Sequence, residues 1–137
     1  KDPFSLRRAS IGILRILIEK KLPLNLVILI EQALKNYGNK IDNLGKTFTD
    51  VMDFINARYR AMYEDQGVAV DTIQSVQAIN PHMPLDFDER IRAVQAFRRL
   101  PQAQSLAQAN KRVGNILAKV DGNISQTVDK NLLTESA

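Results

Sequence analysis

The sequence predicts an all-α fold of about six helices in an irregular, orthogonally packed bundle, with no sheet. Apolar residues recur every three or four positions through most of the chain, and no stretch alternates apolar and polar residues as a strand does. Proline and glycine interrupt the helical pattern at intervals that are typical of turns between helices. A chain of 137 residues is long enough to bury one hydrophobic core.

Residues 1–45 are predicted to form a buried helical hairpin. The first helix, over residues 4–20, is apolar nearly all round, which is typical of a mostly buried helix. Pro23 breaks the pattern, and a second helix over 24–37 ends at Gly38, a favourable C-terminal cap. Neither half of this segment reaches the roughly 20 apolar residues that span a bilayer. We interpret the hairpin as the tail of a preceding helical module, and not as a membrane anchor.

Three further helices are predicted between residues 47 and 100. Residues 38–46 have the composition of a loop, and Thr47 or Thr49 is expected to cap the helix that follows. The apolar stripe of that helix consists of Phe48, Val51, Met52, Ile55, Tyr59, Met62 and Tyr63. A short helix over 70–78 ends before two prolines. Asp86 and Glu89 then have the spacing of a capping box, with Asp86 as the cap.

The helix that Asp86 opens is expected to turn Ile91, Val94 and Phe97 inward. Pro101 suits the first turn of a last helix, which continues to about Val120. The final fifteen residues are polar and carry no cap. We expect a frayed tail there, or the start of a further element.

The charges are segregated along the chain. Residues 61–89 contain six acidic side chains and no lysine or arginine, whereas residues 90–120 contain seven basic side chains and no acid. The seven are Arg90, Arg92, Arg98, Arg99, Lys111, Arg112 and Lys119. Because signs usually mix on a merely solvated surface, this segregation predicts a basic face with an anionic partner.

The last predicted helix has two different stripes. Its expected buried stripe consists of Leu106, Ala109, Val113, Ile116, Leu117 and Val120. Asn110 lies at the edge of that stripe, where it is expected to hydrogen-bond a neighbouring helix. Arg112, Asn115 and Lys119 lie along a second stripe, together with Gln108, and Lys111 lies more nearly opposite the core. Two interpretations stay open for these polar residues: a solvated helix face, or cations for phosphates with an amide that can meet a base edge.

Two other pairs of basic residues are candidates for RNA contact. Arg98 and Arg99 stand at a helix end, where they can bind phosphate or interact favourably with the helix dipole. Arg58 and Arg60 alternate with tyrosines, a pattern that can bind RNA by charge and stacking. Since the tyrosines also lie on an apolar stripe, core packing is the alternative there.

Residues for catalysis or metal binding are scarce. The chain has no cysteine, so zinc–thiolate sites, disulfides and thiol nucleophiles are excluded. His82 is the single histidine, no serine or threonine has a recognisable base, and no nucleotide-binding motif occurs. We therefore predict no catalytic residue and no metal site in this segment.

Four blocks of the sequence are distinctive: "DPFSLRRASIGILRIL" at 2–17, "FINARYRAMYEDQGVAVDTIQSV" at 54–76, "PLDFDERIRAVQAFRRLP" at 84–101 and "ANKRVGNILAK" at 109–119. Together they resemble the C-terminal part of the beta subunit of bacterial glycyl-tRNA synthetase. The blocks occur in the expected order and cover nearly the whole chain.

The resemblance implies a cytoplasmic heterotetramer of two alpha and two beta subunits. It implies that the alpha subunit carries the aminoacylation site for glycine, with ATP and magnesium, so that no cofactor is expected in this segment. Residues 46–137 would form a DALR-like helical anticodon-binding domain, also found in arginyl-tRNA synthetase, whose partner is glycine tRNA. More helical sequence follows the fourth block in the family, so this domain is expected to be C-terminally incomplete here.

Two functional hypotheses follow. In the first, the segment binds tRNA without catalysing a reaction, through Arg98, Arg99, Lys111, Arg112, Asn115 and Lys119, with Arg58 and Arg60. In the second, it is a structural scaffold that packs within its own subunit or against the alpha subunit without touching RNA.

Overall fold

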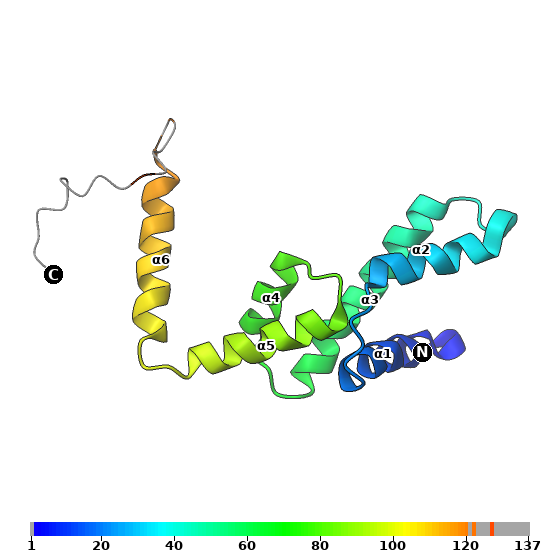
Figure 1. The fold of residues 1–137 in the computed structure, drawn as a ribbon, viewed down its shortest axis with the longest axis horizontal. Coiled ribbons are helices and arrows are strands. Elements are labelled where there is room, and N and C mark those ends of the chain that lie inside the picture. Colours follow the sequence, from blue (N-terminus) through cyan, green and yellow to red (C-terminus); the bar gives the residue numbers. More distant parts are fainter. Residues whose placement is uncertain (1, 121, 123–126, 128–137) are drawn as a thin grey trace, which may run out of the picture. The chain divides into compact units, whose positions relative to one another are not determined.

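The computed structural model describes residues 2–120, 122 and 127. Six α-helices occur in this part of the chain: α1 (Leu6–Glu19), α2 (Leu26–Tyr37), α3 (Leu44–Glu64), α4 (Val70–Ile79), α5 (Pro84–Arg98) and α6 (Ala103–Leu117) (Figure 1). Short 3₁₀ helices, Pro3–Ser5 and Gly38–Lys40, precede α1 and follow α2. The described residues form no strand, so the all-α prediction is confirmed. Contacts divide the chain into two compact units, Lys1–Phe97 and Arg98–Ala137.

Helix α3 is the centre of the first unit. Helices α1, α2 and α4 each pack against it (Figure 1). The helix begins at Leu44 because the Asn43 side chain accepts a hydrogen bond from the backbone N–H of Lys46 (2.9 Å). The prediction that Thr47 or Thr49 caps it is therefore wrong. Both hydroxyls donate instead to backbone carbonyls one turn earlier in the chain.

This early start changes how the chain divides. The boundary predicted between residues 45 and 46 falls inside α3, and the segment 1–45 shares one compact unit with 46–97. Helices α1 and α2 each pack against α3, and they are also less buried than the composition of segment 1–45 predicts. Leu14 and Leu17 of α1 are buried, but Leu6, Ile13 and Ile16 are exposed, because α1 packs one face against α3. The assignments of 1–45 to a preceding module and of 46–137 to a DALR-like domain stay predictions.

The core of the first unit follows the predicted stripe of α3. Ile55, Tyr59, Met62 and Tyr63 are buried, and Phe48, Val51 and Met52 are partly buried against them. Phe87 of α5 stacks on this stripe, with its ring centroid 4.0 Å from that of Tyr59 and 5.6 Å from that of Tyr63. Ile73 and Val76 of α4 belong to the same buried cluster.

Helix α4 ends, as predicted, before the prolines. Asn80 takes the left-handed conformation that asparagine tolerates at a helix end (φ +52°). Helix α5 then begins at Pro84, which suits a first helical position. The prediction that Asp86 is the cap is wrong, since Asp86 lies within the first turn and accepts hydrogen bonds from Arg90. The backbone N–H of Leu26 donates to the carbonyl of His82 (2.9 Å), which ties the start of α2 to this turn.

A polar chain links α3 to α5 through the buried side chain of Asp88. The hydroxyl of Tyr63 donates to Oδ1 of Asp88 (3.0 Å), and Nε of Arg92 donates to Oδ2 of the same carboxylate (2.6 Å). Burial, together with the neighbouring negative charge of Asp88, raises the pKa of Tyr63 above the ordinary tyrosine range. Tyr59 differs: its hydroxyl is buried and has no hydrogen-bond partner among the described residues, and burial alone raises its pKa.

In the second unit, α6 begins at Ala103, and Pro101 lies in the turn before it. Its predicted core stripe is wrong. Leu106, Val113 and Ile116 remain 54%, 52% and 54% exposed, so no described residue of the second unit covers this face. Asn110 is likewise exposed and is no buried-edge residue. The tail predicted for the last fifteen residues lies almost entirely outside the described residues.

Candidate nucleic-acid interface

Helix α6 presents basic residues and an amide at its surface. Lys111, Arg112 and Asn115 are exposed on α6, and Lys119 is exposed in the turn that follows Leu117. Because Arg112, Asn115 and Lys119 are spaced three and four residues apart, they fall along one side of the helix. This matches the second stripe predicted from the sequence. The described residues of the second unit contain no aspartate or glutamate, so the unit offers its cations no carboxylate there.

Arg98 and Arg99 stand where α5 gives way to the turn before α6. Arg98 is the last residue of α5, and both side chains are exposed. Arg98 takes part in an interaction within the chain. Arg99 is the first residue after the end of α5. A basic residue in the last turn of a helix interacts favourably with the helix dipole, so the two interpretations of this pair both stay open.

Two of the seven bases in the acid-free run are neutralised by the acidic block before it. Arg90 pairs with Asp86 (3.0 Å) and Arg92 pairs with Asp88 (2.6 Å), each one helical turn apart on α5. The separation of acidic and basic residues along the sequence therefore partly disappears in the structure. The end of the acidic block and the start of the basic block lie one turn apart on α5, where their charges pair. The other five bases of the run are Arg98, which takes part in an interaction within the chain, and Arg99, Lys111, Arg112 and Lys119.

Arg58 and Arg60 lie on α3, in the first unit. Nε of Arg58 donates to the carbonyl of Phe54 (3.1 Å), and the guanidinium lies 4.4 Å from the centre of the Phe54 ring. Arg60 pairs with Glu64 (2.7 Å). Tyr59 and Tyr63 are buried in the core, which confirms the packing alternative for the tyrosines and leaves them no face for a base to stack on. As RNA contacts, Arg58 and Arg60 stay a prediction.

The structure gives two further findings about the described residues. No three histidine, aspartate or glutamate side chains gather there in a group that could hold a metal ion. None of the helices in this part of the chain is both long enough and apolar enough to cross a membrane.

Comparison with known proteins decides the family. The model of the glycyl-tRNA synthetase beta subunit family matches residues 1–78, more than half of the chain. The chain belongs to this family. The resemblance seen in the four sequence blocks is thereby confirmed at the level of the family. Residues 79–137, which include α5 and α6, lie beyond the range of this match.

Curated relatives in the glycyl-tRNA synthetase beta subunit family align across α5 and α6 as well. A glycine–tRNA ligase beta subunit from Pseudomonas aeruginosa is 54% identical over all 137 residues, and one from Colwellia psychrerythraea is equally similar. One from Actinobacillus pleuropneumoniae is 53% identical over 135 residues. The chain spans only 19–20% of the length of these relatives. No solved structure matches the chain.

Proposed function

We propose that this chain is a non-catalytic tRNA-binding segment of the glycyl-tRNA synthetase beta subunit. The observation that carries the proposal is the exposed basic surface of the second unit, whose described residues include no acid. An RNA backbone is a polyanion that neutralises such a surface, and the family membership supplies tRNA as the RNA.

Each residue type has a distinct part in this proposal. Arg112 and Lys119 bind phosphates on one side of α6, and Asn115 between them can donate to and accept from a base edge or the backbone. Lys111, Arg98 and Arg99 extend the positive surface. The contact is on the anticodon side of glycine tRNA, as the resemblance to a C-terminal anticodon-binding region implies. Glycylation, with ATP and magnesium, takes place on the alpha subunit of the heterotetramer.

The test is the salt dependence of glycine tRNA binding to the full-length beta subunit that carries this segment. Filter binding or gel shift over a range of potassium chloride concentrations gives the slope of log K against log salt. A surface that neutralises several phosphates gives a steep linear decrease, close to one unit of slope for each phosphate. An affinity that does not change with salt would contradict the proposal.

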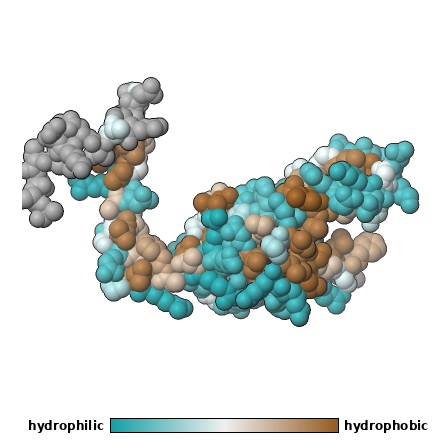
Figure 2. Space-filling view, in the orientation of Figure 1, coloured by the Kyte–Doolittle hydropathy of each residue, from teal (hydrophilic) through white to brown (hydrophobic). Residues whose placement is uncertain are grey.

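A second function is favoured by one specific observation. The apolar stripe of α6 is about half exposed, and brown patches follow this helix in Figure 2. An exposed apolar stripe of this kind is typical of a protein-packing surface. The segment would then be a scaffold that packs within its own subunit or against the alpha subunit. In that case the basic residues would pair with carboxylates, and their removal would leave tRNA binding unchanged.

A further inference from the structure

An apolar groove lies on the first unit between the first half of α1 and the first half of α3, two helices that pack against each other (Figure 1). Its volume is about 380 Å³. Helix α1 contributes Leu6, Ala9 and Ile13 to the lining, and α3 contributes Asp50, Val51 and Phe54. The groove is therefore formed by the flanks of two neighbouring helices, and most of its walls are apolar.

The groove exists because the apolar surface of α1 is wider than the face that packs against α3. Leu14 and Leu17 are buried in the core, whereas Leu6 and Ile13 remain 52% and 45% exposed. Leu6, Ala9 and Ile13 are three and four residues apart, so they fall along one line of the helix beside the buried side chains. A row of this kind leaves a trough into which the side chains of another helix can pack.

A cation borders the groove on the α3 side. The guanidinium of Arg58 lies 4.4 Å from the centre of the Phe54 ring, and that ring lines the groove. Nε of Arg58 donates to the carbonyl of Phe54 (3.1 Å), which leaves four of the five guanidinium N–H donors for other partners. Among the described residues, no carboxylate lies within ion-pair distance of Arg58. Asp50, the acid of the lining, already pairs with Lys46 (2.6 Å).

These charges determine which partner fits the groove. A helix that covers the apolar walls also removes water from Arg58, and a guanidinium that loses water without gaining an acid is strongly destabilising. A carboxylate on the partner restores the pairing, because its two oxygens suit the planar guanidinium. The partner is therefore an amphipathic helix with an aspartate or glutamate beside its apolar stripe.

We propose that the groove docks an amphipathic helix of the same beta subunit, from outside residues 1–137, whose carboxylate pairs with Arg58. The chain spans only 19–20% of the length of its curated relatives, so most of such a subunit lies outside this segment. A helix on the same polypeptide reaches the groove at a high effective concentration, which favours it over a partner recruited from solution. The proposal rests on the family membership and does not depend on tRNA binding by α6.

Photo-crosslinking in the full-length beta subunit, assembled with its alpha subunit, identifies the occupant. A photoreactive amino acid replaces Ile13, and Arg8 is the matched position on α1, because it is exposed and does not line the groove. We expect position 13 to crosslink to one beta-subunit peptide outside residues 1–137 that contains an aspartate or glutamate, and position 8 not to reach it. Crosslinks from position 13 to the alpha subunit or to added tRNA, or none beyond residues 1–137, overturn the proposal.

Hydrogen exchange of the crosslinked helix tests its pairing with Arg58. Arg58→Gln is expected to speed this exchange on the order of tenfold, because the carboxylate of the helix loses a charged partner while the apolar walls remain. Arg60→Gln is the matched control, since Arg60 is on the same helix and pairs with Glu64. It should change the exchange by less than about twofold, as expected for an exposed ion pair. Equal exchange in the two variants contradicts the pairing.

A charge exchange separates this pairing from a general loss of structure. Arg58→Glu should remove the protection of the docked helix, and arginine in place of the helix carboxylate should restore it in the double variant. A double variant no better protected than Arg58→Glu alone contradicts the pairing. Loss of tRNA affinity in Arg58→Gln, with the hydrogen exchange unchanged, would assign Arg58 to RNA and overturn the proposal.

Discussion

Replacing Lys111, Arg112 and Lys119 together with glutamine is expected to weaken glycine tRNA binding by the full-length beta subunit by roughly 10²- to 10³-fold. The slope of log K against log salt should also become about three units shallower, close to one for each phosphate that is no longer neutralised. These side chains are exposed, and the described part of their unit provides no carboxylate that already neutralises them. Glutamine favours helix almost as well as lysine and arginine, so α6 should persist.

The matched control removes the same charge from the first unit. Lys20, Lys35 and Lys46 are exposed, and Lys46 pairs with Asp50. Replacing these three lysines with glutamine should change the tRNA affinity by only a few-fold, because long-range interactions between exposed charges are screened by salt. Equal decreases in affinity in both triple variants would show that net charge, and not the surface of α6, determines binding.

Phe87→Ala is expected to lower the free energy of unfolding of the first unit by about 3–5 kcal/mol. Phe87 is 2% exposed and stacks on both buried tyrosines of α3, so its removal leaves a cavity where α5 meets the centre of the core. Urea unfolding followed by circular dichroism measures the effect. A decrease of less than about 1 kcal/mol would contradict the packing described for this aromatic cluster.

Two tyrosine variants serve as controls that keep the rings in place. Tyr59→Phe removes a buried hydroxyl that has no partner among the described residues, so stability should stay the same or rise slightly. Tyr63→Phe removes the donor to Asp88 and should cost about 1–3 kcal/mol, because one oxygen of a buried carboxylate loses its partner. Equal effects of the two substitutions would contradict the polar chain from Tyr63 to Arg92.

Helices were the most predictable part of this chain. The periodicity of residues 70–79 and the prolines that follow determine α4 with little help from tertiary structure. Capping was less predictable, because several side chains near a helix start are chemically suitable. Asn43 lies in a segment of loop-like composition, which hides its role as a cap, although asparagine is among the best N-caps. Asp86 had the right spacing for a cap, but Pro84 allowed the helix to begin two residues earlier.

Burial was harder to predict, since periodicity identifies an apolar face without identifying what covers it. The stripe of α3 meets α1, α2 and α4 and is buried, whereas the stripe of α6 is as regular and stays exposed.

The candidate RNA-binding site was predictable in part. The stripe of Arg112, Asn115 and Lys119 follows from helical spacing, and the pairing of Arg90 and Arg92 with acids four residues earlier was available from the same rule.

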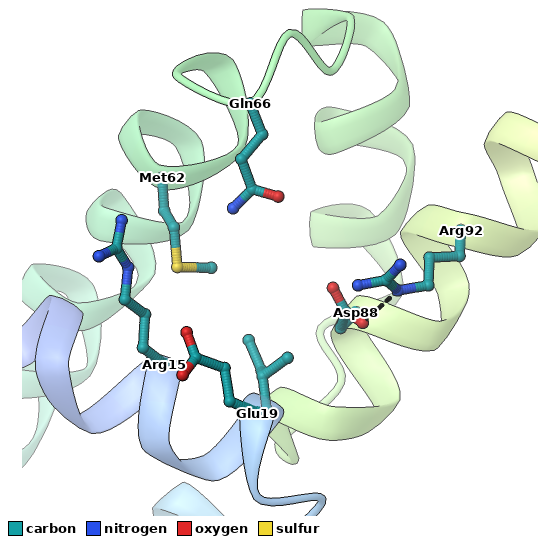
Figure 3. A pocket seen from close by; sticks show the side chains of 7 residues that line it. Arg15, Glu19, Met62, Gln66, Asp88 and Arg92 are labelled. Carbon is teal, nitrogen blue, oxygen red and sulfur yellow. Dashed lines mark hydrogen bonds and ion pairs between the residues drawn. The ribbon is translucent and has the colours of Figure 1, made fainter.

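A polar hollow in the first unit, lined by Arg15, Gln66 and Arg92 among other residues, was not accessible from the sequence (Figure 3). Arg15, Gln66 and Arg92 come from three segments of the chain, and only tertiary packing brings them to one space. The sequence signal that existed was weak: a single arginine, Arg15, in a helix that is otherwise apolar on most sides. The anchor of Arg92 depends on Tyr63 and Asp88, which are 25 residues apart.

The central claim is that the polar stripe of α6 faces tRNA, and photo-crosslinking tests it most directly. A photoreactive amino acid at Gln108 lies on that stripe and leaves every cation in place, and one at the exposed Gln32 of α2 is the control. In the full-length beta subunit bound to glycine tRNA, we expect crosslinks from position 108 to the anticodon side of the RNA and none from position 32. Crosslinks from position 108 to polypeptide alone would contradict the claim and would favour the scaffold function.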